Sequence, residues 1–237
     1  LFTTSCSDFL DEEHKTKYSS EYVFGTPEGL KLAVNALYAL QRYYANDTEN
    51  ATIFALERGT DLAVTNGGTG NFYGIYDPNY LKPSASQVGF MWRTMYQIIG
   101  KANEIIAAAE DLEDTPSLRA TVSEAKCFRA QSYFLLYRTF DRIWLNIQPT
   151  TAENVNDPRD FHAASEKEVF DLIYEDLEYA ITNLDWVSDE AGRFTQAAAR
   201  HMKAKAALWL KDWDTTLEQV EEIEKSGHFD LIALNEV

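Results

Sequence analysis

An aromatic and glycine-rich stretch between residues 66 and 87 carries the side chains best suited to binding chemistry. The candidate ligand contacts in it are Asn71, Phe72, Tyr73, Tyr76 and Tyr80. A flat aromatic ring can stack on the apolar face of a sugar ring, while amide and carboxylate groups hydrogen-bond its hydroxyls. A long aromatic stretch is costly to expose unless it packs or binds something. Two interpretations stay open: the rings bind a ligand, or they anchor the stretch to the protein.

The residue types that catalysis requires form no pattern typical of an enzyme. None of the four histidines has the spacing of a zinc site: His14, His162, His201 and His228. The glycines at 67–70 are not followed by the Lys-Ser/Thr pair of a phosphate loop, and no hydrolase nucleophile motif appears. A glycosidase needs two facing carboxylates, but 38 acidic residues produce such pairs by chance. We therefore expect a protein that is not an enzyme and uses no cofactor or metal.

The charge balance narrows the choice of partners. The chain has 38 acidic and 21 basic residues, a net charge of −17, and no basic run. Such a surface repels a phosphate backbone, so nucleic-acid binding is not expected. No stretch of the sequence is apolar for long enough to cross a membrane.

The first residues, Leu1 to Cys6, resemble the end of a bacterial lipoprotein signal, in which small residues precede a cysteine that becomes lipid-bearing. Lipid chains anchor because each buried CH₂ contributes about 0.8 kcal/mol. Cys6 is the predicted lipidation site, and residues 1–25 are expected to be a signal remnant and an irregular polar tether. The alternative is an ordinary free cysteine. The second cysteine, Cys127, falls in an apolar helix and is expected to be a buried, unreactive thiol.

Helical periodicity predicts the elements that position these residues, and no strand is indicated. The expected helices span about 26–45, 89–111, 115–141, 165–184, 195–210 and 215–225. Thr26 with Pro27 marks one helix start, and Ser165 with Glu168 forms a capping box at another. The helix 115–141 is apolar on most sides, so other helices must surround it. The sequence therefore predicts an all-α protein with its helices packed in layers.

Two helix pairs resemble tetratricopeptide units. In the segment 206–223, small and large residues fall near the places where that repeat keeps them. The other pair consists of the helices 115–141 and 165–184, separated by a long insert at 143–164. The expected fold class is thus all-α, with tetratricopeptide-like helical repeats and long irregular loops.

Several segments together resemble one known family. Residues 123–137 are similar to the pattern G-E-A-K-F-L-R-A-x-x-Y-F-x-L-x, with Ser123 in place of the glycine. Residues 92–106 resemble W-x3-Y-x-x-I-x-x-A-N-x-I-I, and residues 168–180 resemble E-V-x-x-x-I-x-x-D-L-x-x-A. Residues 192–195 resemble the G-R-x-T start of a further helix. These segments, which follow the family's order, make the chain similar to the SusD/RagB family of surface nutrient-binding lipoproteins.

One departure from the family pattern concerns the turn after the helix 115–141. Residues 140–144 read Phe-Asp-Arg-Ile-Trp where the family has Y-G-D-x-P. We therefore expect this turn to differ.

The resemblance implies a SusD-like N-terminal region at residues 26–237, from which the C-terminal half that completes the family's binding face is absent. It implies a non-catalytic lipoprotein of the outer membrane, exposed at the cell surface and attached through its lipid alone. Such a protein captures an oligosaccharide and delivers it to a TonB-dependent transporter of the SusC type. Peptide cargo is a variant. The alternative is a tetratricopeptide-type scaffold that binds a peptide or a helix.

Overall fold

The structure is a computed structural model that describes residues 18–46, 86–151, 153–158 and 161–230. These ranges contain seven α-helices and no strand. The helices are α1 (Ser20–Gly25), α2 (Pro27–Asn46), α4 (Ser86–Ala109), α5 (Pro116–Phe140), α6 (Glu166–Asn183), α7 (Gln196–Leu210) and α8 (Trp213–Lys225). The all-α class expected from the sequence is confirmed.

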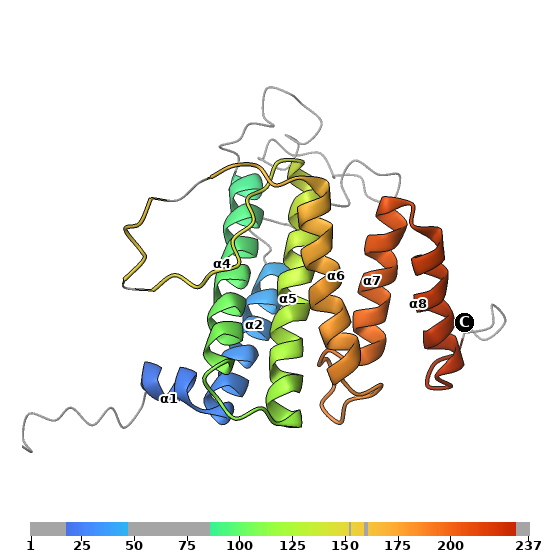
Figure 1. Cartoon of the computed structure of the whole chain (residues 1–237), viewed down its shortest axis with the longest axis horizontal. Coiled ribbons are helices and arrows are strands. Elements are labelled where there is room, and N and C mark those ends of the chain that lie inside the picture. Colours follow the sequence, from blue (N-terminus) through green and yellow to red (C-terminus); the bar gives the residue numbers. More distant parts are fainter. Residues whose placement is uncertain (1–17, 47–85, 152, 159–160, 231–237) are drawn as a thin grey trace, which may run out of the picture.

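The helices from α4 to α8 lie side by side in chain order, and neighbours run in opposite directions (Figure 1). The helix α2 packs against both α4 and α5. The pairs α5–α6 and α7–α8 are the helix pairs that the sequence suggested as repeat units, and their antiparallel packing is compatible with a tetratricopeptide-like arrangement.

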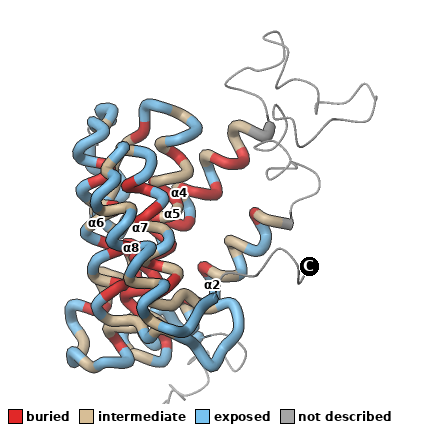
Figure 2. The backbone as a smooth tube through the Cα atoms, turned by 90° about the vertical axis from the view of Figure 1, so that its right-hand side faces the viewer, coloured by how far each residue is buried: buried red, intermediate tan, exposed pale blue. Residues whose placement is uncertain are grey.

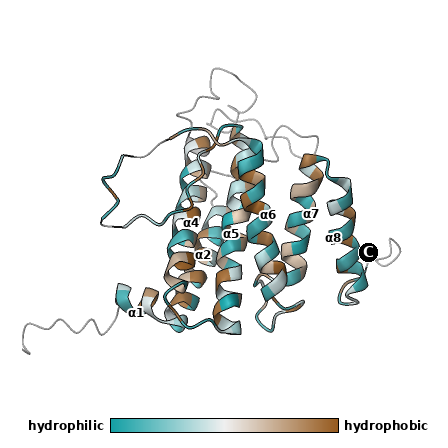
Figure 3. Ribbon diagram, in the orientation of Figure 1, coloured by the Kyte–Doolittle hydropathy of each residue, from teal (hydrophilic) through white to brown (hydrophobic). Residues whose placement is uncertain are grey.

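The helix α5 lies at the centre of the stack, in contact with α2, α4, α6 and α7. Its side chains are buried along most of its length, and the buried positions lie inside the stack (Figure 2). Apolar residues run along α4 and α6 on either side of it (Figure 3). Cys127 is fully buried there, and burial raises the pKa of its thiol well above the ordinary value, which keeps it unreactive. The expected surrounding of this helix and burial of Cys127 are confirmed.

Side-chain caps begin the helices where the sequence predicted them. The hydroxyl of Thr26 accepts the N–H of Gly29 at 3.0 Å, and Pro27 opens α2. At α6 the hydroxyl of Ser165 accepts the N–H of Glu168, whose carboxylate accepts the N–H of Ser165 at 2.8 Å. Each cap satisfies amide groups that the first helical turn leaves without partners.

The helix α1 lies in the range that we expected to be an irregular tether, so that expectation is wrong for residues 20–25. Ser19 caps this helix by accepting the N–H of Tyr22 at 3.1 Å. Gly29 lets α1 approach closely, since a Cβ there would lie 2.2 Å from the carbonyl oxygen of Tyr22. A helix of six residues is too short to show periodicity in a sequence and depends on such packing for its stability.

The turn after α5 is a γ-turn centred on Asp141. Its backbone has φ 61° and ψ −50°, and the N–H of Arg142 donates to the carbonyl of Phe140 at 2.6 Å. Asp141 stands where the family pattern has glycine, the residue that tolerates a positive φ best. The residue type therefore departs from the pattern while the backbone takes a conformation that suits glycine.

None of the described helices combines the length and the apolar character that crossing a membrane requires.

Candidate functional site

The residues that the sequence singled out for binding and anchoring lie outside the described residues. Asn71, Phe72, Tyr73, Tyr76 and Tyr80 fall in the range 47–85, and Cys6 falls in the range 1–17. Their roles therefore stay predictions.

Charged residues of the family-like segment 123–137, which lies on α5, point inward and join three helices. Arg129 donates from Nε to Asp176 Oδ2 at 2.8 Å and from Nη2 to Asp176 Oδ1 at 2.7 Å. Its Nη1 donates to Asn103 Oδ1 on α4 at 2.8 Å, and Lys126 Nζ reaches Asp176 Oδ1 at 2.8 Å. Asp176 on α6 has no exposed surface, so its charge is compensated entirely by these partners. The motif residues hold the fold together and are not available to a ligand.

A second buried link joins two of the family-like segments. Glu124 Oε1 lies 3.1 Å from Nη2 of Arg193, which belongs to the G-R-x-T segment. The hydroxyl of Tyr38 on α2 donates to Glu124 and accepts the N–H of Phe194 at 2.7 Å. Burial raises the pKa of Glu124, and the Tyr38 hydrogen bond and the Arg193 charge oppose that rise.

The connection between α5 and α6, residues 141–165, is pinned to the helices by two tyrosines, which we call the tyrosine clamp (Tyr96 and Tyr133). The hydroxyl of Tyr96 donates to the carbonyl of Trp144 at 2.8 Å and accepts the N–H of the same residue at 2.9 Å. Tyr133 makes the same pair of bonds to Asn146, both at 2.8 Å. Asn103 adds a bond from Nδ2 to the Asn146 carbonyl at 2.7 Å. The tyrosine clamp thus satisfies backbone N–H and C=O groups of this extended segment, as a neighbouring strand would in a sheet.

Burial keeps the clamp hydroxyls protonated. It raises the pKa of Tyr96 to about 12 and raises the pKa of Tyr133 as well. Each hydroxyl can therefore donate one bond and accept another at neutral pH.

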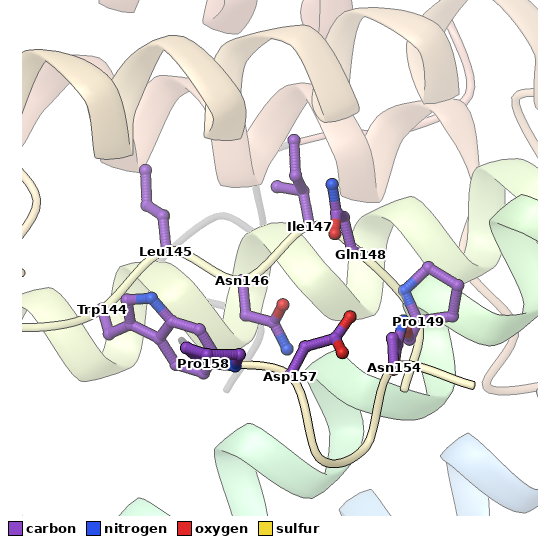
Figure 4. A pocket seen from close by; sticks show the side chains of 9 residues that line it. All are labelled: Trp144, Leu145, Asn146, Ile147, Gln148, Pro149, Asn154, Asp157 and Pro158. Carbon is purple, nitrogen blue, oxygen red and sulfur yellow. The ribbon is translucent and has the colours of Figure 1, made fainter. Parts of the chain in front are cut away.

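A cleft of about 370 Å³ opens on the clamped backbone (Figure 4). Its lining consists of Trp144, Leu145, Asn146, Ile147, Gln148, Pro149, Asn154, Asp157 and Pro158. Along this extended segment, Asn146 points toward Asp157, while Leu145, Ile147 and Gln148 point the other way (Figure 4). The amide of Asn146 and the carboxylate of Asp157 therefore face each other across the cleft.

A turn connects the two parts of the lining, residues 144–149 on one side and Asn154, Asp157 and Pro158 on the other. Asn154 donates from Nδ2 to the carbonyl of Pro149 at 2.9 Å and accepts the N–H of Thr151 at 2.9 Å. The N–H of Asp157 donates to the carbonyl of Asn154 at 3.1 Å. Because both the oxygen and the nitrogen of the Asn154 side-chain amide are bonded within this turn, Asn154 stabilises the shape of the cleft.

Aromatic rings border the cleft on one side. Trp144 lies between Tyr96, at a ring-centroid distance of 6.4 Å, and Phe161, at 4.8 Å. Phe161 is 70% exposed and presents a large apolar surface to the solvent. Exposed aromatic surface beside amide and carboxylate groups suits a small polar ligand with an apolar face. The described residues contain no group of three or more His, Cys, Asp or Glu side chains that could hold a metal ion.

Sequence reasoning missed this cleft, because we treated residues 143–164 as a spacer between two helices. A signal was present in the composition. The insert exceeds the usual length of a helix connection and combines Trp144 with several Asn, Gln and Pro residues.

A larger cleft of about 630 Å³ lies beside the connection from α6 to α7. Its charged residues are largely paired with one another. Lys31 Nζ lies 3.2 Å from Glu190 Oε1, and Arg193 pairs with Glu124. These groups are thus less free to meet a ligand than those of the smaller cleft.

Comparison with known proteins places these features in a family context. Residues 8–208 match the model of the SusD-like family described as "Starch-binding associating with outer membrane". A SusD-like protein of Bacteroides ovatus is 28% identical over 90% of this chain, which spans 38% of that relative. The relative is thus much longer than the chain.

Solved structures share the fold. A SusD-like carbohydrate-binding protein of Bacteroides fragilis superposes with a TM-score of 0.74 at 20% identity, covering 86% of this chain and 41% of its own. A laminarin-binding SusD-like protein superposes with a TM-score of 0.72 at 25% identity, covering 83% of this chain and 43% of its own.

Proposed function

The chain belongs to the SusD-like family, whose model matches residues 8–208, and from this membership we propose that it is part of a non-catalytic, cell-surface glycan-capture protein. The protein binds an oligosaccharide and delivers it to a TonB-dependent transporter of the SusC type at the outer membrane. The family match is the observation that carries this proposal, and the family's description as starch-binding supports it.

The chain spans 38% of the Bacteroides ovatus relative, so the ligand and the partner of the whole protein belong to the proposal. The similarity to a laminarin-binding protein supports a glycan as the ligand. In this account Asn71, Phe72, Tyr73, Tyr76 and Tyr80 contact the glycan, and lipidated Cys6 anchors the protein in the outer membrane. Capture requires binding and release without any bond being broken.

A scaffold that binds a peptide or a helix is the second candidate, and one observation favours it. The helices α7 and α8 expose large apolar side chains, namely Leu208, Trp209, Trp213, Leu217 and Val220. Such a set on two adjacent helices suits an apolar helix or peptide.

A glycan-array screen of the full-length protein separates the two candidates. Changing Tyr73, Tyr76 and Tyr80 together to alanine is expected to weaken glycan binding at least about tenfold, equivalent to about 1.4 kcal/mol. The exposed Tyr18, changed to alanine, provides a control outside this stretch. Unchanged glycan binding in the triple variant would assign the contacts to other residues. Failure of the wild-type protein to bind any glycan would favour the peptide-binding scaffold.

A further inference from the structure

The cleft on the α5–α6 connection has a preformed floor. The tyrosine clamp fixes the backbone of Trp144 and Asn146 through four hydrogen bonds of 2.8–2.9 Å. Asn103 links the same backbone to Arg129, and through it to Asp176 on α6. Moving the floor would break these part-buried hydrogen bonds, so the floor is held in place without a ligand. A site that is ordered in advance loses less entropy when it binds.

The side chains at the cleft are suited to hydroxyl groups. Asn146 supplies an amide that donates and accepts, and Asp157 supplies a carboxylate that accepts. Trp144 and Pro158, which both line the cleft, add apolar surface to it (Figure 4). Hydroxyls on the edge of a ring with an apolar face complement this combination.

The charge of the lining selects against acidic ligands. None of the nine lining residues is cationic, and Asp157 adds a negative charge to a chain whose net charge is −17. A carboxylated or sulfated sugar would meet repulsion with no compensating partner in this lining. The volume of about 370 Å³ is at the small end of ligand pockets, which favours a short unit over a long chain.

We propose that this cleft, with Asn146 and Asp157 as its polar contacts, is a subsite for a neutral pyranose unit, formed by residues other than the aromatic stretch at 66–87. The inference rests on the proposed function, because it gives the glycan a second point of attachment. Asp157 accepts hydrogen bonds from ring hydroxyls, Asn146 binds further hydroxyls, and the apolar face packs against Pro158 and the part of Trp144 that Tyr96 and Phe161 leave uncovered.

Titration calorimetry on the full-length protein tests the subsite. The probes are neutral laminarin-derived and malto-oligosaccharides and, for comparison, anionic alginate oligosaccharides. The variants are Asn146→Ala, Asp157→Ala and Asp157→Asn, and the matched control is Asp171→Ala, an exposed residue on α6 that lines neither cleft. Asn146 meets the clamp through its backbone, so the alanine variant keeps those bonds. Thermal unfolding monitored by circular dichroism verifies that each variant is folded.

The expected result is that Asp157→Ala weakens the binding of a neutral oligosaccharide about tenfold or more and Asn146→Ala about three- to tenfold. Asp171→Ala should leave the affinity unchanged. Unchanged affinity in all folded cleft variants, with glycan binding by the wild type intact, overturns the subsite and leaves the proposed function standing. If alginate oligosaccharides bind more tightly than the neutral probes, and the cleft variants lose this binding, the assignment of the subsite to a neutral sugar is overturned. If the wild type binds no glycan, the proposed function fails and the subsite fails with it.

Discussion

Arg129 and Asp176 meet in a two-pronged ion pair, with Nε 2.8 Å from Oδ2 and Nη2 2.7 Å from Oδ1. The two residues belong to separate family-like segments, one on α5 and one on α6. Because both are buried, the family pattern in these segments reflects how the helices are joined. The residues that meet a ligand must be sought in the connections between helices.

Replacing Asp176 by alanine should destabilise the protein by about 3–5 kcal/mol, since it leaves the Arg129 and Lys126 charges buried without a partner. Urea unfolding measures the change. Asp171→Ala, which removes an exposed partner of Lys167 on the same helix, is the control and should be nearly neutral. A loss below about 1 kcal/mol for Asp176→Ala would contradict the network described for these helices.

Replacing Tyr133 by phenylalanine should cost about 1–3 kcal/mol, because the variant removes a hydroxyl that bonds both backbone groups of Asn146. The same variant should loosen the cleft and weaken oligosaccharide binding. Tyr137→Phe, one turn further along α5, is the matched control, since its hydroxyl bond to Glu166 is exposed. Equal unfolding midpoints for the two variants would show that the clamp contributes no special stability.

Replacing Asp141 by glycine should raise stability by about 0.5–1 kcal/mol. The γ-turn holds Asp141 at φ 61°, where a side chain is strained and glycine is not, and this relief exceeds the extra entropy of an unfolded glycine. Thermal unfolding of the two proteins side by side measures the gain. Asp214→Gly, in the first turn of α8, should instead lower stability. A lower melting temperature for Asp141→Gly would refute the strain.

Glu124 should make stability fall as pH rises above its ordinary pKa of 4.5. Burial raises its pKa in the folded state, so between the two values the folded protein binds the proton more tightly than the unfolded chain. The contribution of Glu124 is therefore greatest at low pH and declines as pH rises through the folded-state pKa. Urea unfolding at pH 4 and pH 7 compares the wild type with Glu124→Gln.

The stability of the wild type relative to Glu124→Gln should decrease between pH 4 and pH 7. Glu221→Gln, on the exposed part of α8, controls for the removal of a carboxylate. An increase of the wild-type advantage with pH would mean that the Arg193 pair outweighs the cost of burial.

The sequence predicted the helices where a local signal marked them. Thr26, Thr115 and Ser165 begin their helices by capping bonds that can be recognised from a few neighbouring residues. The helix α1 escaped prediction because its stability depends on contact with Gly29 of α2, which no short window reveals.

The composition of the α5–α6 connection carried a signal, but the shape of the cleft could not be predicted. That shape depends on hydrogen bonds from Tyr96 to Trp144, 48 residues later, and from Tyr133 to Asn146, 13 residues later, and both tyrosines look like ordinary core residues in the sequence. The inward charges of Lys126 and Arg129 were missed in the same way, because helical periodicity alone assigns charges to the surface. The predicted contacts at residues 71–80 lie outside the described residues and stay predictions.

Glycan capture without chemistry is the central claim, and affinity electrophoresis of the full-length protein in gels containing laminarin or starch, paired with chromatography of the incubated glycan, tests it most directly. Capture without bond cleavage should give retarded migration in at least one neutral glycan gel and no new reducing ends after prolonged incubation. Migration unchanged in every glycan, or the appearance of shortened products, would contradict it.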